Sequence, residues 1–279
     1  MFNFKPERVR EPLGAGTFGN VFAYKKNDGD TEWAVKKIYA KDIHRLLSYM
    51  QEIVIGFSCD HLSILPLRGY YIEHLNQNDF NIYIKLPRMQ DNLLNKIKTL
   101  KENILKEDVV IKYSYILACG LDYLHKKRIA HRDIKPSNIL IDKEGKLKIC
   151  DMGAGKFIPE TETVSELHDY AGTPFYTAPE IINSEQTLKK RDLFKADIWS
   201  LGVVMAELCL HDISFFGKRR MKKEELMRNK LNELENKPYS KELLELIMCL
   251  LKDDPEKRMD AAEIKRKLEE KFSNLLVDY

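Results

Sequence analysis

Apolar and polar side chains alternate in short segments through the first third of the chain, which is the period of half-buried β-strands. Segments 21–26 and 33–40 flank the turn sequence Asn-Asp-Gly-Asp at 27–30, so they predict a β-hairpin. Segments 64–72 and 80–86 predict two further strands. We therefore expect the N-terminal part of the chain to fold around a sheet.

One helix interrupts these strands, and long helices dominate the rest of the chain. Segment 42–57 carries apolar residues at helical spacing, namely Ile43, Leu46, Leu47, Met50, Ile53 and Val54. Four later segments are long and helically periodic: 108–127, 197–210, 240–252 and 260–272. The pattern predicts a small strand-dominated lobe and a larger helical lobe, and a cleft between two such lobes is where a ligand most often sits.

Composition and charge argue against several classes of protein. The chain has 279 residues, enough for one large domain or two small lobes, and its net charge is only +3. Lysine and glutamate alternate in the C-terminal third, which is typical of a solvated surface and not of a nucleic-acid interface. The N-terminus lacks the apolar core of a signal peptide, and no apolar run reaches membrane-spanning length. We therefore expect neither a nucleic-acid nor a membrane partner.

The cysteines bear on the cellular compartment. They are odd in number, scattered and mostly in apolar surroundings: Cys59, Cys119, Cys150, Cys209 and Cys249. No two have the spacing of metal ligands, so buried free thiols in a reducing compartment are favoured. The prediction is a cytoplasmic protein, with entry into the nucleus left open.

A glycine-rich stretch at 13–22, LGAGTFGNVF, is the first candidate for chemistry. Gly14, Gly16 and Gly19 follow the pattern G-x-G-x-x-G, and Val21 comes two residues later. Glycines at this spacing let backbone N–H groups approach phosphate oxygens, although the spacing alone favours a glycine-rich hairpin without a ligand. A dinucleotide-binding turn would lead directly into a helix. A strand follows here, which predicts a glycine flap between two strands.

Lys36 is the second candidate, because strand alternation places it on the same face as Ala34 and Ile38. A lysine on an apolar face requires a counter-charge, and Glu52 in the helical segment 42–57 is the available one. The alternative is a solvated lysine on an edge strand.

The segment 131–140, HRDIKPSNIL, sets several charges beside apolar stretches. Asp133 could be a helix N-cap and Asn138 a turn former. Those roles leave Arg132 and Lys135 as unpaired charges next to a buried segment, which is unfavourable. A ligand that meets these charges would resolve the conflict.

Asp151 ends the apolar strand at 147–149 and precedes Met152 and Gly153. A carboxylate at a strand end before a glycine turn is common in α/β proteins. Asn138 and Asp151 together could supply oxygen ligands for Mg²⁺, which favours few protein oxygens plus phosphate.

Taken together, these segments resemble a eukaryotic-type protein kinase catalytic domain of the serine/threonine branch. The signatures GAGTFGNV, AVK, HRDIKPSN, DMG and APE stand in the family's order, followed by DIWSLG and by Arg258 in DPEKRM. The resemblance implies an α+β, bilobal fold over residues 1–279. It implies an N-lobe (1–88) with a small antiparallel β-sheet and one main helix, a hinge near 86–89, and a larger, mostly helical C-lobe (89–279).

The resemblance also implies a reaction, the transfer of the γ-phosphoryl group of Mg-ATP to Ser/Thr hydroxyls of protein substrates. Asp133 would orient the attacking hydroxyl and accept its proton, and Lys135 would stabilise charge on the transferring group. Asn138 and Asp151 would hold Mg²⁺. Glu180 would pair with Arg258 inside the helical lobe.

The implied nucleotide site extends over the glycine flap, the anchoring ion pair, the adenine pocket and the hinge: Leu13, Gly14, Ala15, Gly16, Thr17, Phe18, Gly19, Asn20, Val21, Ala34, Lys36, Glu52, Leu86, Pro87, Met89 and Leu140. Lys36 would position the α- and β-phosphates. Leu86 would be the gatekeeper, Pro87 would offer only its carbonyl to adenine, and Met89 would offer an N–H.

Two departures from the family pattern concern helix 42–57. Met152 replaces the Phe of the family's D-F-G motif, and its pliable side chain predicts softer packing around this position. Gly56 stands where a bulky apolar residue is usual, so a gap is expected and the helix should be loosened by about 1 kcal/mol. The prediction is a mobile helix that needs an activating partner, or a neighbour such as Phe57, to fill the space. Leucine at position 56 is expected to raise thermal stability or basal activity.

A third departure is Asp169, four residues before Thr173, where many relatives carry a phosphorylated residue. Asp169 is hypothesised to substitute in part for that phosphate opposite Arg132, and a solvated loop aspartate is the alternative. The same loop offers candidate sites for an upstream kinase: Thr161, Thr163 and Ser165.

Two other functions are alternatives to an active kinase. A pseudokinase scaffold would usually lack one of Lys36, Asp133 and Asp151, and all three are present. A kinase of small molecules is disfavoured by the intact GTPFYTAPE, which in the family shapes a peptide-docking surface. Segment 211–237 could be a docking surface, and a solvated helix pair is the alternative.

Overall fold

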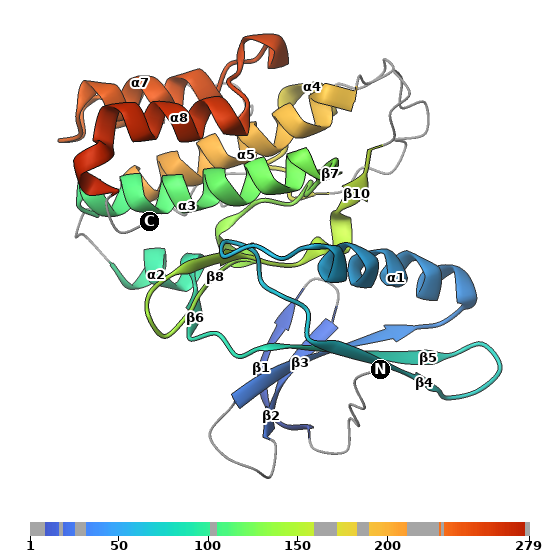
Figure 1. Cartoon of the computed structure of the whole chain (residues 1–279). Coiled ribbons are helices and arrows are strands. Elements are labelled where there is room, and N and C mark those ends of the chain that lie inside the picture. Colours follow the sequence, from blue (N-terminus) through green and yellow to red (C-terminus); the bar gives the residue numbers. More distant parts are fainter. Residues whose placement is uncertain are drawn as a thin grey trace.

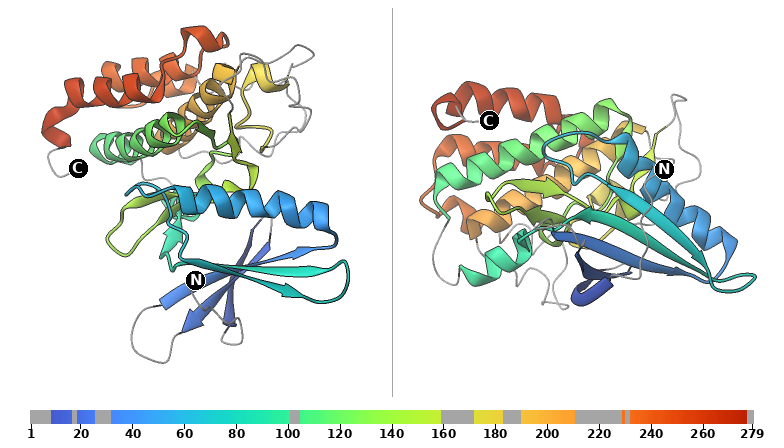
Figure 2. Two further views of the ribbon diagram at one scale, coloured as in Figure 1. Left: turned by 45° about the vertical axis from the view of Figure 1, so that its right-hand side comes forward. Right: turned by 60° about the horizontal axis from the view of Figure 1, so that its bottom comes forward.

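The computed structural model describes residues 9–16, 19–25, 32–100, 105–158, 172–182, 190–210, 229 and 232–276. Figure 1 shows a twisted β-sheet at one end of the molecule and a group of helices at the other, with helix α1 between them. The two views in Figure 2 show the same separation from other directions. The predicted combination of an antiparallel sheet with one helix and a larger helical part is therefore confirmed.

The N-terminal sheet has five antiparallel strands in the order β1-β2-β3-β5-β4. Their bounds are Val9–Gly16 for β1, Gly19–Lys25 for β2, Glu32–Ala40 for β3, Gly69–His74 for β4 and Phe80–Pro87 for β5. The predicted hairpin is present as β2 and β3, which pair Val21 with Lys36. The strand predicted from residue 64 begins only at Gly69, because Ile64 instead bridges to Ile149 in the helical part.

Helix α1 runs from Ile43 to Ser58. Its N-cap is Asp42, whose side chain accepts a hydrogen bond from the backbone N–H of Arg45 at 2.7 Å. The helix was predicted correctly, but its buried face was not. Leu46 and Ile53 are buried, whereas Ile43, Leu47 and Val54 are about half exposed. The apolar stripe is wider than the contact surface offered by the sheet, so part of it faces outward.

The C-terminal part is built on helices that share one large apolar core. They are α2 (Leu93–Thr99), α3 (Glu107–Lys126), α4 (Pro179–Ile182), α5 (Lys190–Leu210), α7 (Lys241–Leu250) and α8 (Ala261–Phe272). Helices α3 and α5 are the longest, and they pack against each other and against α8 and α7 respectively. The four predicted helical segments are confirmed as α3, α5, α7 and α8.

The C-terminal part also contains short strands and single 3-10 turns. Strand β6 (Asp91–Asn92) pairs with β8 (Ile139–Ile141), which pairs with β9 (Leu147–Ile149), and β7 (Ile129–Ala130) pairs with β10 (Lys156–Phe157). The turns are η2 (Pro136–Asn138), η3 (Met152–Ala154), η5 (Pro255–Lys257) and η6 (Ser273–Leu275). Of these elements, η2 contains Asn138, β8 contains Leu140, and η3 begins directly after Asp151.

The predicted gap beside Gly56 does not exist. Gly56 is buried, and a Cβ atom added to it would lie 2.9 Å from Cδ1 and 3.2 Å from Cβ of Leu67. Phe57, the neighbour expected to fill the space, is 45% exposed and packs edge-on against Tyr70. Leu67 occupies the space instead, which removes the reason for expecting leucine at position 56 to raise thermal stability or basal activity.

The predicted pair between Glu180 and Arg258 is confirmed. Both terminal nitrogens of Arg258 donate to the carboxylate, at 2.6 and 2.7 Å, and the guanidinium lies 5.0 Å from the ring centroid of Trp199. The remaining N–H groups donate to backbone carbonyls of Lys195, Lys252 and Asp253. The Arg258 side chain is fully buried, so the pair fixes α4 against α5.

Two further findings bear on the expected cellular setting. All five cysteines are free. Within the described ranges, none of the helices combines the length and the apolar character needed to cross a membrane.

The first prediction concerns Gly56→Leu. Overpacking against Leu67 should lower the free energy of unfolding by about 1–3 kcal/mol, which for a domain of this size is a fall of about 2–4 °C in Tm for each kcal/mol. Leu67→Ala in the same chain should recover part of the loss, because it frees the space. Thermal denaturation of the single and double variants checks this, and a Tm at or above wild type for Gly56→Leu would contradict it.

The second prediction concerns Arg258→Met. It leaves the carboxylate of Glu180, whose side chain is only 12% exposed, without its partner, which should lower the free energy of unfolding by about 3–5 kcal/mol in urea denaturation. Lys241→Met is the matched control, because Lys241 pairs with Glu245 at 3.5 Å with side chains 85% and 57% exposed. Exposed pairs contribute about 0–1 kcal/mol, so equal losses in the two variants would refute the structural role of Arg258.

Candidate active site

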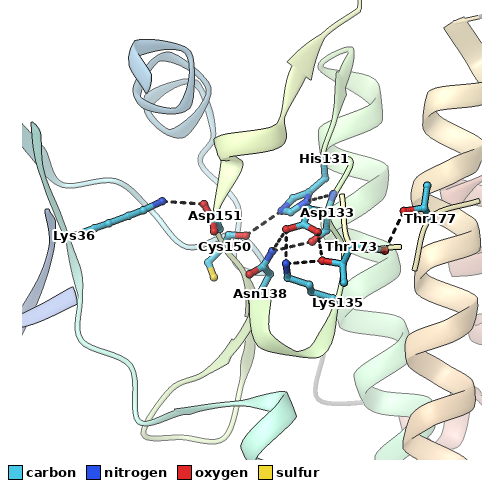
Figure 3. A network of polar contacts seen from close by, with 9 residues as sticks. All are labelled: Lys36, His131, Asp133, Lys135, Asn138, Cys150, Asp151, Thr173 and Thr177. Carbon is cyan, nitrogen blue, oxygen red and sulfur yellow. Dashed lines mark hydrogen bonds and ion pairs between the residues drawn. The ribbon is translucent and has the colours of Figure 1, made fainter. Parts of the chain in front are cut away.

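Lys36 connects the sheet to the helical part. It lies in the middle of β3, between Val21 of β2 and Ile84 of β5, and it is buried. Its Nζ donates to Oε1 of Glu52 at 2.7 Å and to Oδ1 of Asp151 at 2.9 Å. The predicted pair with Glu52 is confirmed, and the solvated edge-strand alternative is wrong because β3 is an interior strand. The direct contact with Asp151, drawn in Figure 3, was not predicted.

The charges around Lys36 explain the direction in which the pKa values of Lys36 and Glu52 are shifted. Burial alone would lower the pKa of Lys36, but the carboxylates of Glu52 and Asp151 outweigh it and raise that pKa above its usual value. Burial raises the pKa of Glu52, and Lys36 opposes the rise only in part. One ammonium thus faces two carboxylates, and Oε2 of Glu52 has no hydrogen-bond partner among the described residues. A cation beside Asp151 would offset the surplus negative charge.

Asp133 is the centre of a second network, also drawn in Figure 3. Its carboxylate lies 2.7 Å from Nζ of Lys135 and accepts hydrogen bonds from Oγ1 of Thr173 at 3.0 Å and from Nδ2 of Asn138 at 2.9 Å. Lys135 also donates to Oγ1 of Thr173 at 2.8 Å. The N-cap alternative for Asp133 is therefore wrong, because its oxygens bind side chains and not the first turn of a helix. Thr173, named above only to locate Asp169, also belongs to this network.

Asp197 in α5 holds the loop that carries Asp133. Its carboxylate accepts hydrogen bonds from the backbone N–H groups of His131 at 2.9 Å and Arg132 at 2.8 Å. The ring of His131 is fully buried, and its Nε2 lies 3.0 Å from the carbonyl oxygen of Cys150. Arg132 has a φ of 69°, a conformation that usually costs about 1–3 kcal/mol and must be stabilised by such contacts. In the sequence, Asp197 is the first residue of the DIWSLG motif. That motif supported the family resemblance but did not predict a contact with the loop of Asp133.

Asn138 and Asp151 lie at the same end of the β8–β9 hairpin, which pairs Ile139 with Ile149. The N–H of Cys150 donates to the carbonyl of Asn138 at 2.9 Å and ties the two loops together. Nδ2 of Asn138 is used by Asp133, which leaves its amide oxygen for another ligand. Asp151 comes directly after Cys150, and its φ of 65° lies in the left-handed region.

These two residues fit a magnesium ion. Amide and carboxylate oxygens are hard ligands, and Mg²⁺ takes only one or two protein groups when a phosphate supplies the rest. Within the part of the chain that the structure describes, no group of three or more His, Cys, Asp or Glu residues is arranged to hold a metal. A site with two protein oxygens and a nucleotide is consistent with that finding.

The glycine stretch is a flap between two strands, as predicted, because β1 and β2 pair Gly14 with Val21 and Gly16 with Gly19. A Cβ atom on Gly19 would lie 2.3 Å from the carbonyl oxygen of Lys37. This glycine is therefore required by the close approach of β2 to β3, whatever it does for phosphate. Thr17 and Phe18 lie outside the described residues.

The predicted adenine pocket draws on several strands. Ala34 of β3 pairs with Leu86 of β5, and Ala34 is buried. Leu140 lies on β8, where it pairs with Asn92, and Leu13 on β1 is 41% exposed. The contact of these residues with a nucleotide, like that of Ala15, Asn20, Pro87 and Met89, stays a prediction.

Met152 packs into the large apolar core and is 5% exposed. The softer packing predicted from it stays a prediction. Asp169 and the three candidate phosphosites, Thr161, Thr163 and Ser165, lie outside the described residues, because the structure describes none of positions 159–171. The same is true of positions 211–228 in the candidate docking segment.

Comparison with known proteins identifies the class. The profile of the family described as "Protein kinase domain" matches residues 8–268. The chain is 29% identical over 299 residues to "Probable serine/threonine-protein kinase nek1" of Dictyostelium discoideum, an alignment that covers 97% of this chain and 58% of that protein. It is 34% identical over 203 residues to "Serine/threonine-protein kinase pakH" of the same organism, covering 72% of this chain and 36% of that protein.

A plant relative gives the same result. "Mitogen-activated protein kinase kinase kinase 1" of Arabidopsis thaliana is 32% identical over 262 residues, covering 90% of this chain and 40% of that protein. The chain belongs to the protein kinase domain family. It spans between 36% and 58% of the length of the three relatives named here. Members of this family generally use ATP and Mg²⁺.

The third prediction concerns Asp151→Asn. Removing one of two carboxylates around Lys36 should leave the Tm of the free protein unchanged or higher. The rise in Tm with ATP and Mg²⁺, which follows from selective binding to the folded state, should be mostly lost. Asp60→Asn, an exposed aspartate after α1, is the control and should keep the full rise. A full Mg²⁺-dependent rise in Asp151→Asn would exclude this residue as a metal ligand.

Proposed function

We propose that this chain is an active protein serine/threonine kinase, which transfers the γ-phosphoryl group of Mg-ATP to Ser/Thr hydroxyls of protein substrates. The observation that carries the proposal is that two polar networks are formed at once. One joins Lys36 to Glu52 and Asp151, and the other joins Asp133 to Lys135 and Thr173. The names of the relatives support the serine/threonine class.

The residues have distinct tasks in this reaction. Asp133, held by three side chains, would orient the acceptor hydroxyl and take its proton. Lys135, 2.7 Å from that carboxylate, lies where it can stabilise negative charge on the transferring group. Asn138 and Asp151 would hold Mg²⁺, which when bound neutralises charge on the phosphates. Lys36, kept protonated by its two carboxylates, would bind the α- and β-phosphates.

The proposed nucleotide site lies between an N-lobe of residues 1–88 and a C-lobe of residues 89–279, with the hinge at 86–89. Its roof is the flap of Gly14 to Gly19, and the adenine ring would lie between the side chains of Leu13, Val21, Ala34 and Leu140. Pro87 cannot donate a hydrogen bond, so its carbonyl and the N–H of Met89 are the groups offered to adenine.

A loosened helix at Gly56 would have favoured a scaffold over an active enzyme. Because Leu67 fills the space beside that glycine, the predicted gap gives the scaffold no support. Lys36, Asp133 and Asp151 are all present and connected, which supports catalysis over a purely binding role.

The partners and location are part of the same proposal. The partners would be protein substrates and an upstream kinase or activating protein, and the upstream kinase would act at Thr161, Thr163 or Ser165. A cytoplasmic location with access to the nucleus is supported by the five free thiols, which are typical of a reducing compartment.

The fourth prediction tests the reaction itself. Purified protein with Mg²⁺ and labelled ATP should phosphorylate a generic basic protein on Ser or Thr. Asp133→Asn should lower the rate by about 10²–10⁴-fold, the usual contribution of a general base, with Tm nearly unchanged. Thr173→Val should also lower it, and Thr173→Ser should retain most activity because it keeps the bridging hydroxyl.

Two outcomes would count against the proposal. A wild-type protein without phosphate transfer that still binds Mg-ATP would favour a scaffold. Equal activity of wild type and Asp133→Asn would show that the signal comes from a contaminant. A peptide array would then define the substrate sequence of an active protein.

A further inference from the structure

Helix α1 belongs to both parts of the molecule. Leu46 and Ile53 pack in the core under the N-terminal sheet, whereas Ile55 packs in the large core of the helical part. Ile55 also lies against Gly155, where an added Cβ atom would be 3.2 Å from Cδ1 of Ile55. These apolar contacts keep the helix near the junction, but they are not directional. They set which face of the helix is buried, and a hydrogen bond can add a more exact constraint on its orientation.

A single polar contact between α1 and the Asp151 turn is directional. Nε2 of Gln51 donates a hydrogen bond to the carbonyl oxygen of Gly155 at 3.2 Å. Gly155 ends the turn that begins at Asp151, and its own N–H donates to the carbonyl of Met152 at 2.9 Å. The acceptor for Gln51 is therefore presented only while the turn after Asp151 keeps this conformation.

Gln51 directly precedes Glu52, so the two side chains leave the helix about 100° apart. Anchoring Gln51 to the turn therefore constrains the direction in which Glu52 points. Glu52 reaches Lys36 at 2.7 Å, and Lys36 reaches Asp151 at 2.9 Å. Gln51, Glu52, Lys36, Asp151 and Gly155 thus form a closed chain of contacts around the junction.

We propose that Gln51 is a positioning residue, which holds α1 to the turn after Asp151 so that Glu52 stays paired with Lys36. It touches neither the nucleotide nor the acceptor in this proposal. Its effect on rate rests on the proposed kinase function, whereas its effect on nucleotide binding does not require phosphate transfer. The bond couples the position of the helix to the conformation of a turn that carries a metal ligand.

The test uses Gln51→Met, which keeps the length, the helix propensity and the neutral charge of the side chain but removes the donor. One neutral hydrogen bond is worth about a 3- to 10-fold change in an equilibrium. We therefore expect kcat/KM for ATP to fall about 3- to 10-fold, with Tm close to wild type. Gln51→Lys, which restores a donor, should recover most of the loss. Gln77→Met, at an exposed glutamine in the β4–β5 turn, is the matched control and should behave as wild type.

A double-mutant cycle with Glu52→Gln separates positioning from a general structural role. If Gln51 acts through Glu52, Gln51→Met should change ATP affinity by less than about 2-fold in the Glu52→Gln background. An equal factor in both backgrounds, or a fall in Tm that accounts for the loss, would overturn the inference. If the wild-type protein lacks transferase activity, the rise in Tm on adding Mg-ATP can be measured for the same four proteins. Failure of the proposed function and failure of the Gln51 role are therefore distinguishable.

Discussion

The structure depends on one buried ammonium that joins two carboxylates from different parts of the chain. Lys36 comes from an interior strand, Glu52 from the helix beside the sheet, and Asp151 from a turn in the helical part. Because all three are largely removed from water, each carboxylate would be unfavourable without the lysine, and the lysine would be unfavourable without them. The relative positions of the helix, the sheet and the turn at Asp151 therefore depend on one shared electrostatic interaction.

The second network is rigid for a different reason. Asp133 sits on a loop with a left-handed residue, Arg132, which a free peptide would avoid. The carboxylate of Asp197 accepts two consecutive backbone N–H groups of that loop from inside the helical core. A buried helix thereby fixes a strained loop, and the loop presents Asp133 to Lys135 and Thr173. Dipoles fixed in this way need little reorganisation during a reaction, which favours electrostatic catalysis.

The error at Gly56 shows where local reasoning fails. A glycine within a helix predicts looseness, and the family pattern predicted a missing side chain. The space was taken by Leu67, which stands eleven positions later in a segment without helix or strand structure before β4. Volume in a core is a shared quantity, so a small residue on one element can be matched by a large one on another. No pattern within the helix could reveal that exchange.

By itself, the sequence determined the elements, their order and the residue types of the site, because periodicity and motif spacing are local properties of the chain. It also indicated the pair of Lys36 and Glu52, since a lysine on an apolar strand face needs a counter-charge. Only the tertiary structure decided that Asp151, 115 positions away, completes that pair, and that Thr173 bridges Asp133 and Lys135. These contacts depend on how the sheet and the helices pack, and packing is set by the whole core and not by any one segment.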